Sequence, residues 1–185
     1  MRSIIFVISM LMLTLSVQAQ RRLHGQQGLQ ATIGIVDKFD KSSIHTGFAL
    51  SRFTKNSHQW KFGAEYLHKK LQYRLQPVPV EQFTAEAGYY RTFLSDGSKT
   101  FFFTAGLSGM AGYELVNRDR TFLYDGSTLL SKSKFLMGGA FSFEIETYLV
   151  DEIILLTGFR GRVLPASTVN EFHTQFYAGI KFIIN

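Results

Sequence analysis

The stretch FLMGGAFSFEIE, residues 135–146, alternates between two kinds of side chain. Phe141, Phe143 and Ile145 are apolar, whereas Ser142, Glu144 and Glu146 between them are polar. Successive side chains of a β-strand point to opposite faces of the sheet. The stretch is therefore predicted to be a strand with one apolar face and one face of small and charged residues.

The same period of two recurs along the chain, and no stretch after residue 28 shows a sustained helical pattern of apolar residues. Short connections at 56–57, 95–98 and 150–151 alternate along the chain with longer ones at 37–43, 70–81, 118–133 and 164–170. In an antiparallel sheet this order places every short turn and both chain ends on one rim. The expected strands are 29–37, 44–54, 58–69, 82–93, 100–115, 134–149, 152–163 and 171–184.

The content of the second face favours one class of barrel over another. A soluble lipocalin-like barrel would turn its apolar face inward and show water a face rich in charged residues. Here the second face is rich in glycine, with charges of both signs, which suits the narrow interior of an eight-stranded membrane barrel. We therefore predict an eight-stranded antiparallel up-and-down outer-membrane β-barrel. Its lumen is expected to hold an ion-pair network of Lys61, Glu65, Glu86, Glu144, Glu146, Arg160, Arg162 and Lys181.

The first residues have the features of an export signal. A basic start at Arg2 precedes an apolar run over 4–17, and a small-residue site predicts cleavage after Ala19. That run is too short to span a bilayer as a helix. The expected organisation is a signal peptide at 1–19, a periplasmic tail at 20–28 and a barrel at 29–185, located in the bacterial outer membrane.

Charge suggests two contact surfaces. The 185-residue chain has a formal net charge of +6 and no cysteine, but its basic residues are scattered, so no direct nucleic-acid binding is expected. On the rim of long loops, Lys69, Lys70 and Arg74 are candidates for contact with lipopolysaccharide phosphates. In the tail, Arg21, Arg22 and His24 are candidates for docking a periplasmic partner.

The sequence does not point to catalysis. Its five histidines lack metal-binding spacing, and no glycine loop opens a helix to cradle phosphate, so neither a metal nor another cofactor is expected. His45 and His173 are expected to face the lumen. A site on the loop rim built from His45 and nearby Asp and Ser residues is an alternative, but loops carry such residues for reasons of turn geometry alone.

Two segments resemble a known family. The stretch QRRLHGQQG at 20–28, with Thr32-Ile33-Gly34 and Val36-Asp37 after it, is similar to the mature N-terminus of TraO proteins of conjugative transposons. The closing YAGIKFIIN at 177–185 is similar to the end of the same family. The resemblance implies a non-catalytic component of a DNA-transfer apparatus at the outer membrane, acting with other conjugal transfer proteins. The alternatives are a stand-alone OmpA- or OmpX-like barrel for envelope integrity or adhesion, and a secreted lipocalin-like binder of apolar ligands.

Overall fold

Eight antiparallel strands close into one barrel, as the alternation predicts. The computed structural model describes residues 22–37, 43–73, 76–117, 133–168 and 170–184. Each strand hydrogen-bonds to its neighbours in the chain, and β1 closes the circle by pairing with β8. The strands are β1 (Gln27–Val36), β2 (Ser43–Phe53), β3 (Gln59–Tyr73), β4 (Gln76–Ser95), β5 (Phe101–Val116), β6 (Lys134–Val150), β7 (Ile153–Val163) and β8 (Phe172–Ile183).

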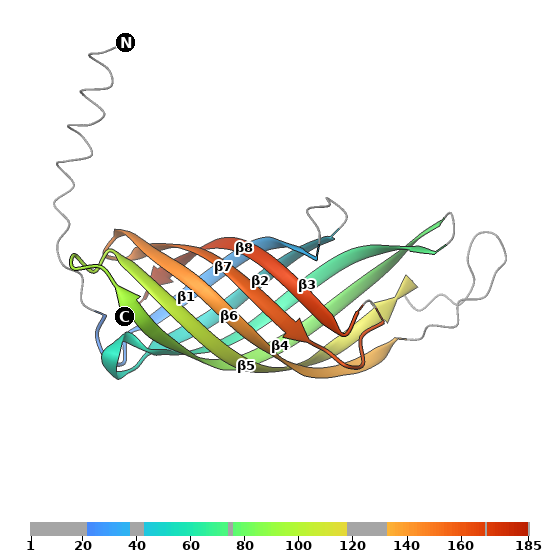
Figure 1. The fold of residues 1–185 in the computed structure, drawn as a ribbon, viewed down its shortest axis with the longest axis horizontal. Helices are drawn as coiled ribbons and strands as arrows, with labels where there is room; N and C mark the ends of the chain where they lie inside the picture. Colours follow the sequence, from blue (N-terminus) through green and yellow to red (C-terminus); the bar gives the residue numbers. More distant parts are fainter. Residues whose placement is uncertain (1–21, 38–42, 74–75, 118–132, 169, 185) are drawn as a thin grey trace, which may run out of the picture.

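The barrel has two distinct ends (Figure 1). At the end that we call the turn end, β2 passes to β3 through the 3₁₀ turn Lys55–Ser57, and short connections at 96–100 and 151–152 join the next two strand pairs. The start of β1 and the end of β8 lie at this end too, where Ile184 donates its N–H to the carbonyl of Gln27. We call the opposite end, where β1 ends and β2 begins, the loop end.

One predicted loop is largely strand. Residues 70–81 were expected to form a long loop, but β3 continues to Tyr73 and β4 begins at Gln76, so the hairpin extends beyond the rest of the wall (Figure 1). Pro77 and Pro79 suggested a loop because proline cannot donate to a sheet ladder. Both prolines pair with β3, whereas the pairing of β4 with β5 starts only at Val80. Their alternate positions put both missing N–H groups on one edge of the strand, where proline is tolerated.

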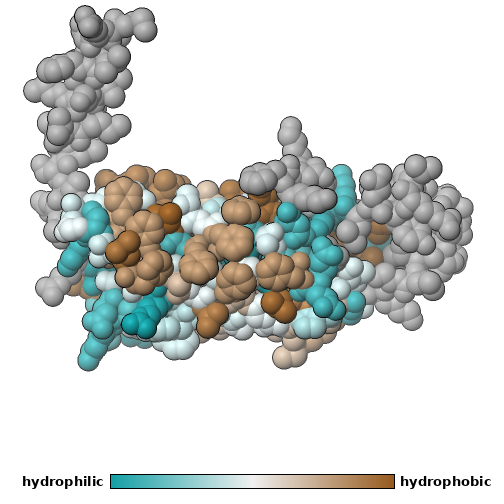
Figure 2. Space-filling model, in the orientation of Figure 1, coloured by the Kyte–Doolittle hydropathy of each residue, from teal (hydrophilic) through white to brown (hydrophobic). Residues whose placement is uncertain are grey.

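The apolar face of the strands is the outer face. Phe48, Leu107 and Met137 are among its most exposed side chains. Figure 2 shows apolar side chains spread over the wall, with polar ones concentrated toward the two ends. Aromatic pairs mark those ends on the outer face: Trp60 packs on Tyr89 with ring centroids 5.1 Å apart, and Tyr66 on Phe83 at 4.9 Å. This is the surface of a barrel surrounded by lipid, and it is the reverse of the lipocalin-like alternative, which requires an apolar interior.

The described part of the chain holds no helix that is both long enough and apolar enough to cross a bilayer.

The glycines of the inner face let the strands and the lumenal rings approach closely. A Cβ added at Gly112 of β5 would lie 2.1 Å from the carbonyl oxygen of Phe83, an atom of the backbone. On the same strand Gly109 faces outward, and a Cβ there would meet nothing within 4 Å. A methyl group at Gly112 would therefore clash with the neighbouring strand, whereas one at Gly109 would not.

This difference gives a matched pair of variants. Gly112→Ala is expected to lower the free energy of unfolding by about 1–3 kcal/mol, because the neighbouring strand must move to accommodate the methyl group. Gly109→Ala is expected to stay within about 0.5 kcal/mol of the wild type. Urea unfolding of the refolded barrel in detergent micelles measures both values. Equal effects would mean that the inner face of β5 is not packed as described.

Candidate functional site

The lumen contains two clusters of charged side chains, and the one nearer the turn end is centred on Glu144 and Glu146. These neighbours on β6 both point inward because they are two residues apart. Lys61 of β3 forms an ion pair with Glu144 across the lumen. Lys181 Nζ of β8 lies 2.9 Å from Glu146 Oε1, and Gln59 donates to the same oxygen at 2.6 Å. All these side chains are buried, so each charge depends on its partners rather than on water.

The cluster nearer the loop end is centred on Glu65 of β3. Arg162 Nη1 lies 2.6 Å from Glu65 Oε1, and Arg160 Nη1 lies 3.0 Å from Glu65 Oε2. The other terminal nitrogen of Arg160 is 3.1 Å from Glu86 Oε1. The two guanidinium groups thus share the carboxylate of Glu65, and Arg160 also pairs with Glu86. His45, also buried as expected, has its Nδ1 3.6 Å from Glu65 Oε2.

The structure brings the eight residues of the expected lumenal network into these two clusters. The neutral groups that complete the clusters also occupy inward-facing positions of their strands, but they were not included among the sequence candidates. Tyr177 donates to Glu144 Oε1 at 2.6 Å, Gln175 donates to Glu65 at 2.7 Å, and Tyr90 lies beneath the Lys61 ammonium. Glu114 was also missed, although it shares the inward parity of β5; it is fully buried and accepts hydrogen bonds from Gln82 and Ser167.

Arg22 is not the exposed docking residue that its place in the tail suggested. Its guanidinium enters the lumen at the turn end, where Nη2 lies 2.6 Å from Glu146 Oε2 and both side chains are fully buried. The guanidinium also stacks over the ring of Phe102, 3.7 Å from its centroid. The tail is held across the barrel mouth because Gly25 donates its N–H to the carbonyl of Phe53. A buried carboxylate and an aromatic face outweigh hydration of this cation.

The other tail candidates are divided by the structure. His24 is exposed beside Arg22, and Arg21 lies outside the described residues. The tail is also shorter than the expected 20–28, because Gln27 and Gly28 pair with β2 and belong to β1.

The candidates for lipopolysaccharide contact differ in whether their charge is already paired with a carboxylate. Lys69 Nζ lies 2.5 Å from Asp37 Oδ2, so its charge is already paired. Burial would raise the pKa of Asp37, but hydrogen bonds from Lys69 and from the backbone N–H of Thr174 outweigh burial and lower the pKa below its ordinary value of 3.8. His173, which faces the lumen as expected, approaches the same carboxylate at 3.2 Å. Lys70 is exposed, and Arg74 lies outside the described residues.

The lumen is built to hold charge in place rather than to move it. Lys61, Arg160 and Arg162 each reach across the interior to a carboxylate on another strand, and their side chains are buried. An eight-stranded barrel has an interior just wide enough to be filled by side chains. Among the described residues, no group of three or more histidines and carboxylates is arranged to hold a metal ion.

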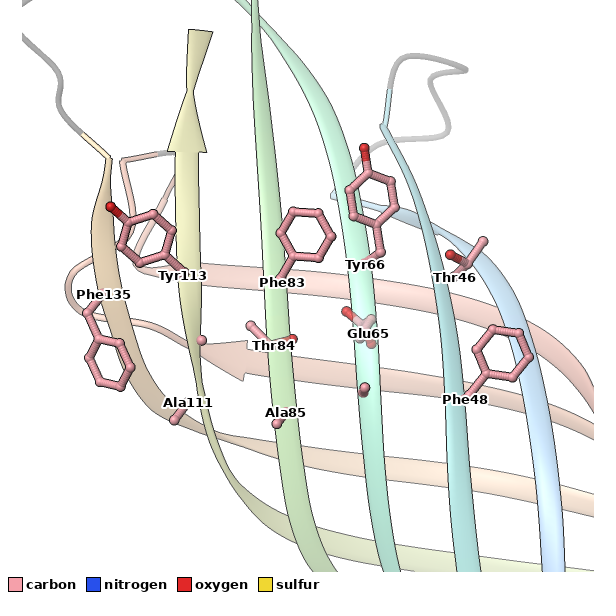
Figure 3. A pocket seen from close by; sticks show the side chains of 12 residues that line it. Thr46, Phe48, Glu65, Tyr66, Phe83, Thr84, Ala85, Ala111, Tyr113 and Phe135 are labelled. Carbon is pink, nitrogen blue, oxygen red and sulfur yellow. The ribbon is translucent and has the colours of Figure 1, made fainter. Parts of the chain in front are cut away.

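A shallow groove of about 520 Å³ lies on the outer wall (Figure 3). Its floor is a row of alanines in register on β3, β4 and β5, namely Ala64, Ala85 and Ala111. Rings such as Phe83 and Tyr113 stand along one side. Specific ligand sites add a few well-placed polar groups to apolar walls. Two of the polar residues near this groove, Glu65 and Thr84, are instead engaged by Arg162 in the lumen. The hydroxyl groups of Thr46, Tyr66 and Tyr113 remain on its wall, which is otherwise apolar, so lipid acyl chains suffice to fill most of the groove.

Comparison with solved structures places the fold among small outer-membrane barrels. Neisserial surface protein A has a TM-score of 0.59 and 12% sequence identity, over 85% of this chain and 97% of that chain. Ail, the attachment invasion locus protein of Yersinia pestis, has a TM-score of 0.57 and 8% identity, over 88% of this chain and 100% of its own. The N-terminal barrel domain of Pseudomonas aeruginosa OprF has a TM-score of 0.52 and 10% identity, over 87% and 100%.

A comparison with functionally curated proteins found no match. The family comparison is specific: residues 19–184 match the model described as conjugative transposon protein TraO. This match spans the barrel and the tail that closes its mouth, and it agrees with the resemblance of the two ends of the chain. The fold resembles that of small outer-membrane barrels, and the family model is that of a conjugative transposon protein. The chain belongs to the TraO family of conjugative transposon proteins.

Proposed function

We propose that this protein is a non-catalytic outer-membrane component of a conjugative DNA-transfer apparatus, with a role in its structure or assembly. The observation that carries the proposal is the combination of the TraO match with a lumen crossed by buried ion pairs. A filled eight-stranded barrel is too narrow to pass DNA. Its part in transfer is therefore played by its surfaces and not by its interior.

Location and partners follow from the same surfaces. The outward apolar band with aromatic ends supports insertion into the outer membrane, after export and cleavage of the signal peptide behind Ala19. The turn end then faces the periplasm and the loop end faces the outside. Lipid and lipopolysaccharide surround the wall, and the candidates for phosphate contact at the outer rim are Lys69, Lys70 and Arg74. Of these, Lys70 is exposed and forms no ion pair with the residues that the structure describes. Other transfer proteins are the expected protein partners.

Deleting the gene in a donor cell tests the proposal. Mating frequency is expected to fall to that of a donor lacking another essential transfer gene, while envelope permeability stays normal. Supplying the wild-type gene in trans is the control and is expected to restore mating. Normal mating by the deletion strain would overturn the proposal.

A second candidate function is surface attachment. The observation in its favour is the β3–β4 hairpin, which extends beyond the barrel wall at the loop end, together with the fold shared with Ail, an attachment invasion locus protein. Shortening this hairpin is expected to reduce adhesion if attachment is the function. It is expected to leave mating unchanged if the two activities are separate.

A further inference from the structure

A polar cleft of about 480 Å³ lies at the turn end of the barrel. Three separate segments form it: the tail at 22–24, the β2–β3 turn at 54–57, and Lys99 from the β4–β5 connection. Arg22 belongs to its lining while its guanidinium reaches down to Glu146 in the lumen. The cleft therefore lies over the barrel mouth, where the aqueous periplasm has access to it.

The lining is basic. It includes Arg22, His24, Lys55 and Lys99 and no carboxylate. Lys55 and Lys99 are exposed, and neither side chain forms an ion pair with any residue that the structure describes. The nearest acid in sequence is Asp96, whose Oδ1 accepts a hydrogen bond from the N–H of Phe101 at 2.8 Å. The cleft thus presents two cations, Lys55 and Lys99, whose charge is not balanced by any described residue of the cleft, whereas the charge of Arg22 is balanced by Glu146 in the lumen.

A separate set of cations is placed for lipid headgroups. Arg52 and Arg91 are exposed at the turn end of β2 and β4, and Arg52 is paired in register with Trp60 on the outer wall. Cations at this height are positioned to meet the phosphates of the inner leaflet. Lys55 and Lys99 lie in the connections beyond the strand ends, beside the tail that crosses the mouth. This separation favours an occupant that comes from the periplasm over one that comes from the bilayer.

We propose that the cleft binds a short acidic peptide segment of a periplasmic protein. Carboxylate side chains complement the unbalanced cations, and the volume of the cleft is that of a site for a few side chains. Arg22 adds a rigid floor, because ion pairing to Glu146 and stacking on Phe102 fix its position. That the segment belongs to a transfer protein rests on the proposed function, whereas the affinity for carboxylates does not.

Binding of fluorescein-labelled hexaglutamate tests the proposal. The mature protein is placed in phosphatidylcholine nanodiscs, and fluorescence anisotropy is followed at low ionic strength, where surface charges are least screened. The double variant Lys55→Glu/Lys99→Glu is expected to weaken binding by about tenfold. The matched control Arg52→Glu/Arg91→Glu changes the net charge equally and is expected to stay within about twofold. Equal losses in the two variants would overturn the proposal, because they would show only general attraction by a basic protein.

Lipid and transfer are tested separately. If Lys55→Glu/Lys99→Glu reduces retention of phosphatidylglycerol and leaves peptide binding intact, the cleft is a headgroup site and the proposal is wrong. In donor cells the same variant is expected to lower mating at a normal level of the protein in the outer membrane. Unchanged mating, in a system where gene deletion abolishes it, would overturn the assignment of the partner while the proposed function stands. Normal mating after gene deletion would overturn the proposed function itself.

Discussion

Replacing Glu146 with alanine is expected to lower the free energy of unfolding by about 3–5 kcal/mol, the usual cost of breaking a buried ion pair from one side. Glu146 is fully buried and is the shared partner of Arg22 at 2.6 Å and Lys181 at 2.9 Å, with Lys61 at 3.9 Å. Without it, Arg22 and Lys181 lose their carboxylate partner, and Glu144 is the one carboxylate left in this buried cluster of described residues. The variant thus leaves charge uncompensated rather than merely removing a contact.

Urea unfolding in detergent micelles measures this loss through Trp60, the single tryptophan of the chain, whose ring lies on the outer wall. Glu146→Gln separates charge from shape, because the amide keeps the size of the side chain, and it is expected to destabilise the barrel by a similar amount. Glu152→Ala is the matched control: this carboxylate is exposed in the β6–β7 turn, and its loss is expected to cost less than about 0.5 kcal/mol. A loss below about 1 kcal/mol for Glu146→Ala would show that its partners are stabilised by other means.

Strand parity is the reason why the sequence predicts so much of this lumen. Once Phe143 and Ile145 are assigned to the outer face, Glu144 and Glu146 have to point inward, whatever the rest of the chain does. The same rule places Lys61 and Lys181 inside, and it applied to Glu114, although that residue was not included among the candidates. Parity, that is, whether a residue stands at an odd or an even position of its strand, decides which face of the sheet its side chain points to. This holds for each residue separately and requires no knowledge of the neighbouring strands.

Parity does not decide which residues meet inside the barrel. Contact between Arg160 and Glu65 depends on the stagger of β7 and β3 on different sides of the lumen, and stagger is set by the register of every strand pair between them. The sequence therefore predicts the members of the network but not its division into two clusters.

The position of Arg22 could not be predicted for a different reason. It belongs to no strand, and its guanidinium enters the lumen because the chain turns at Gly25, which hydrogen-bonds to Phe53. The period-two pattern of strand residues predicts neither of these two features. The length of the β3–β4 hairpin was missed because Pro77 and Pro79 are read as loop residues until the edge on which they fall is known.

An arginine in place of Leu107 is expected to cost about 2–4 kcal/mol of unfolding free energy in lipid vesicles, which is the penalty for this charge near the bilayer midplane on a barrel wall. Leu107 is 73% exposed on the outer face of β5, midway between the aromatic residues Phe101 and Tyr113. If water surrounded the wall, the same change would be a harmless surface substitution. The variant therefore distinguishes a barrel surrounded by lipid from one surrounded by water.

The control for this experiment is the same substitution at a position nearer the membrane interface. Thr147→Arg places the same charge on the outer face of β6, at the turn end, where Thr147 is in register with Phe101. Near the interface the penalty falls to about 0–1 kcal/mol, because the guanidinium can reach the headgroups. Unfolding in urea, followed by Trp60 fluorescence in vesicles, is expected to show a large loss for Leu107→Arg and a small one for Thr147→Arg. Equal losses would place both positions at the same depth, and the absence of any loss would mean that the apolar wall is not covered by lipid.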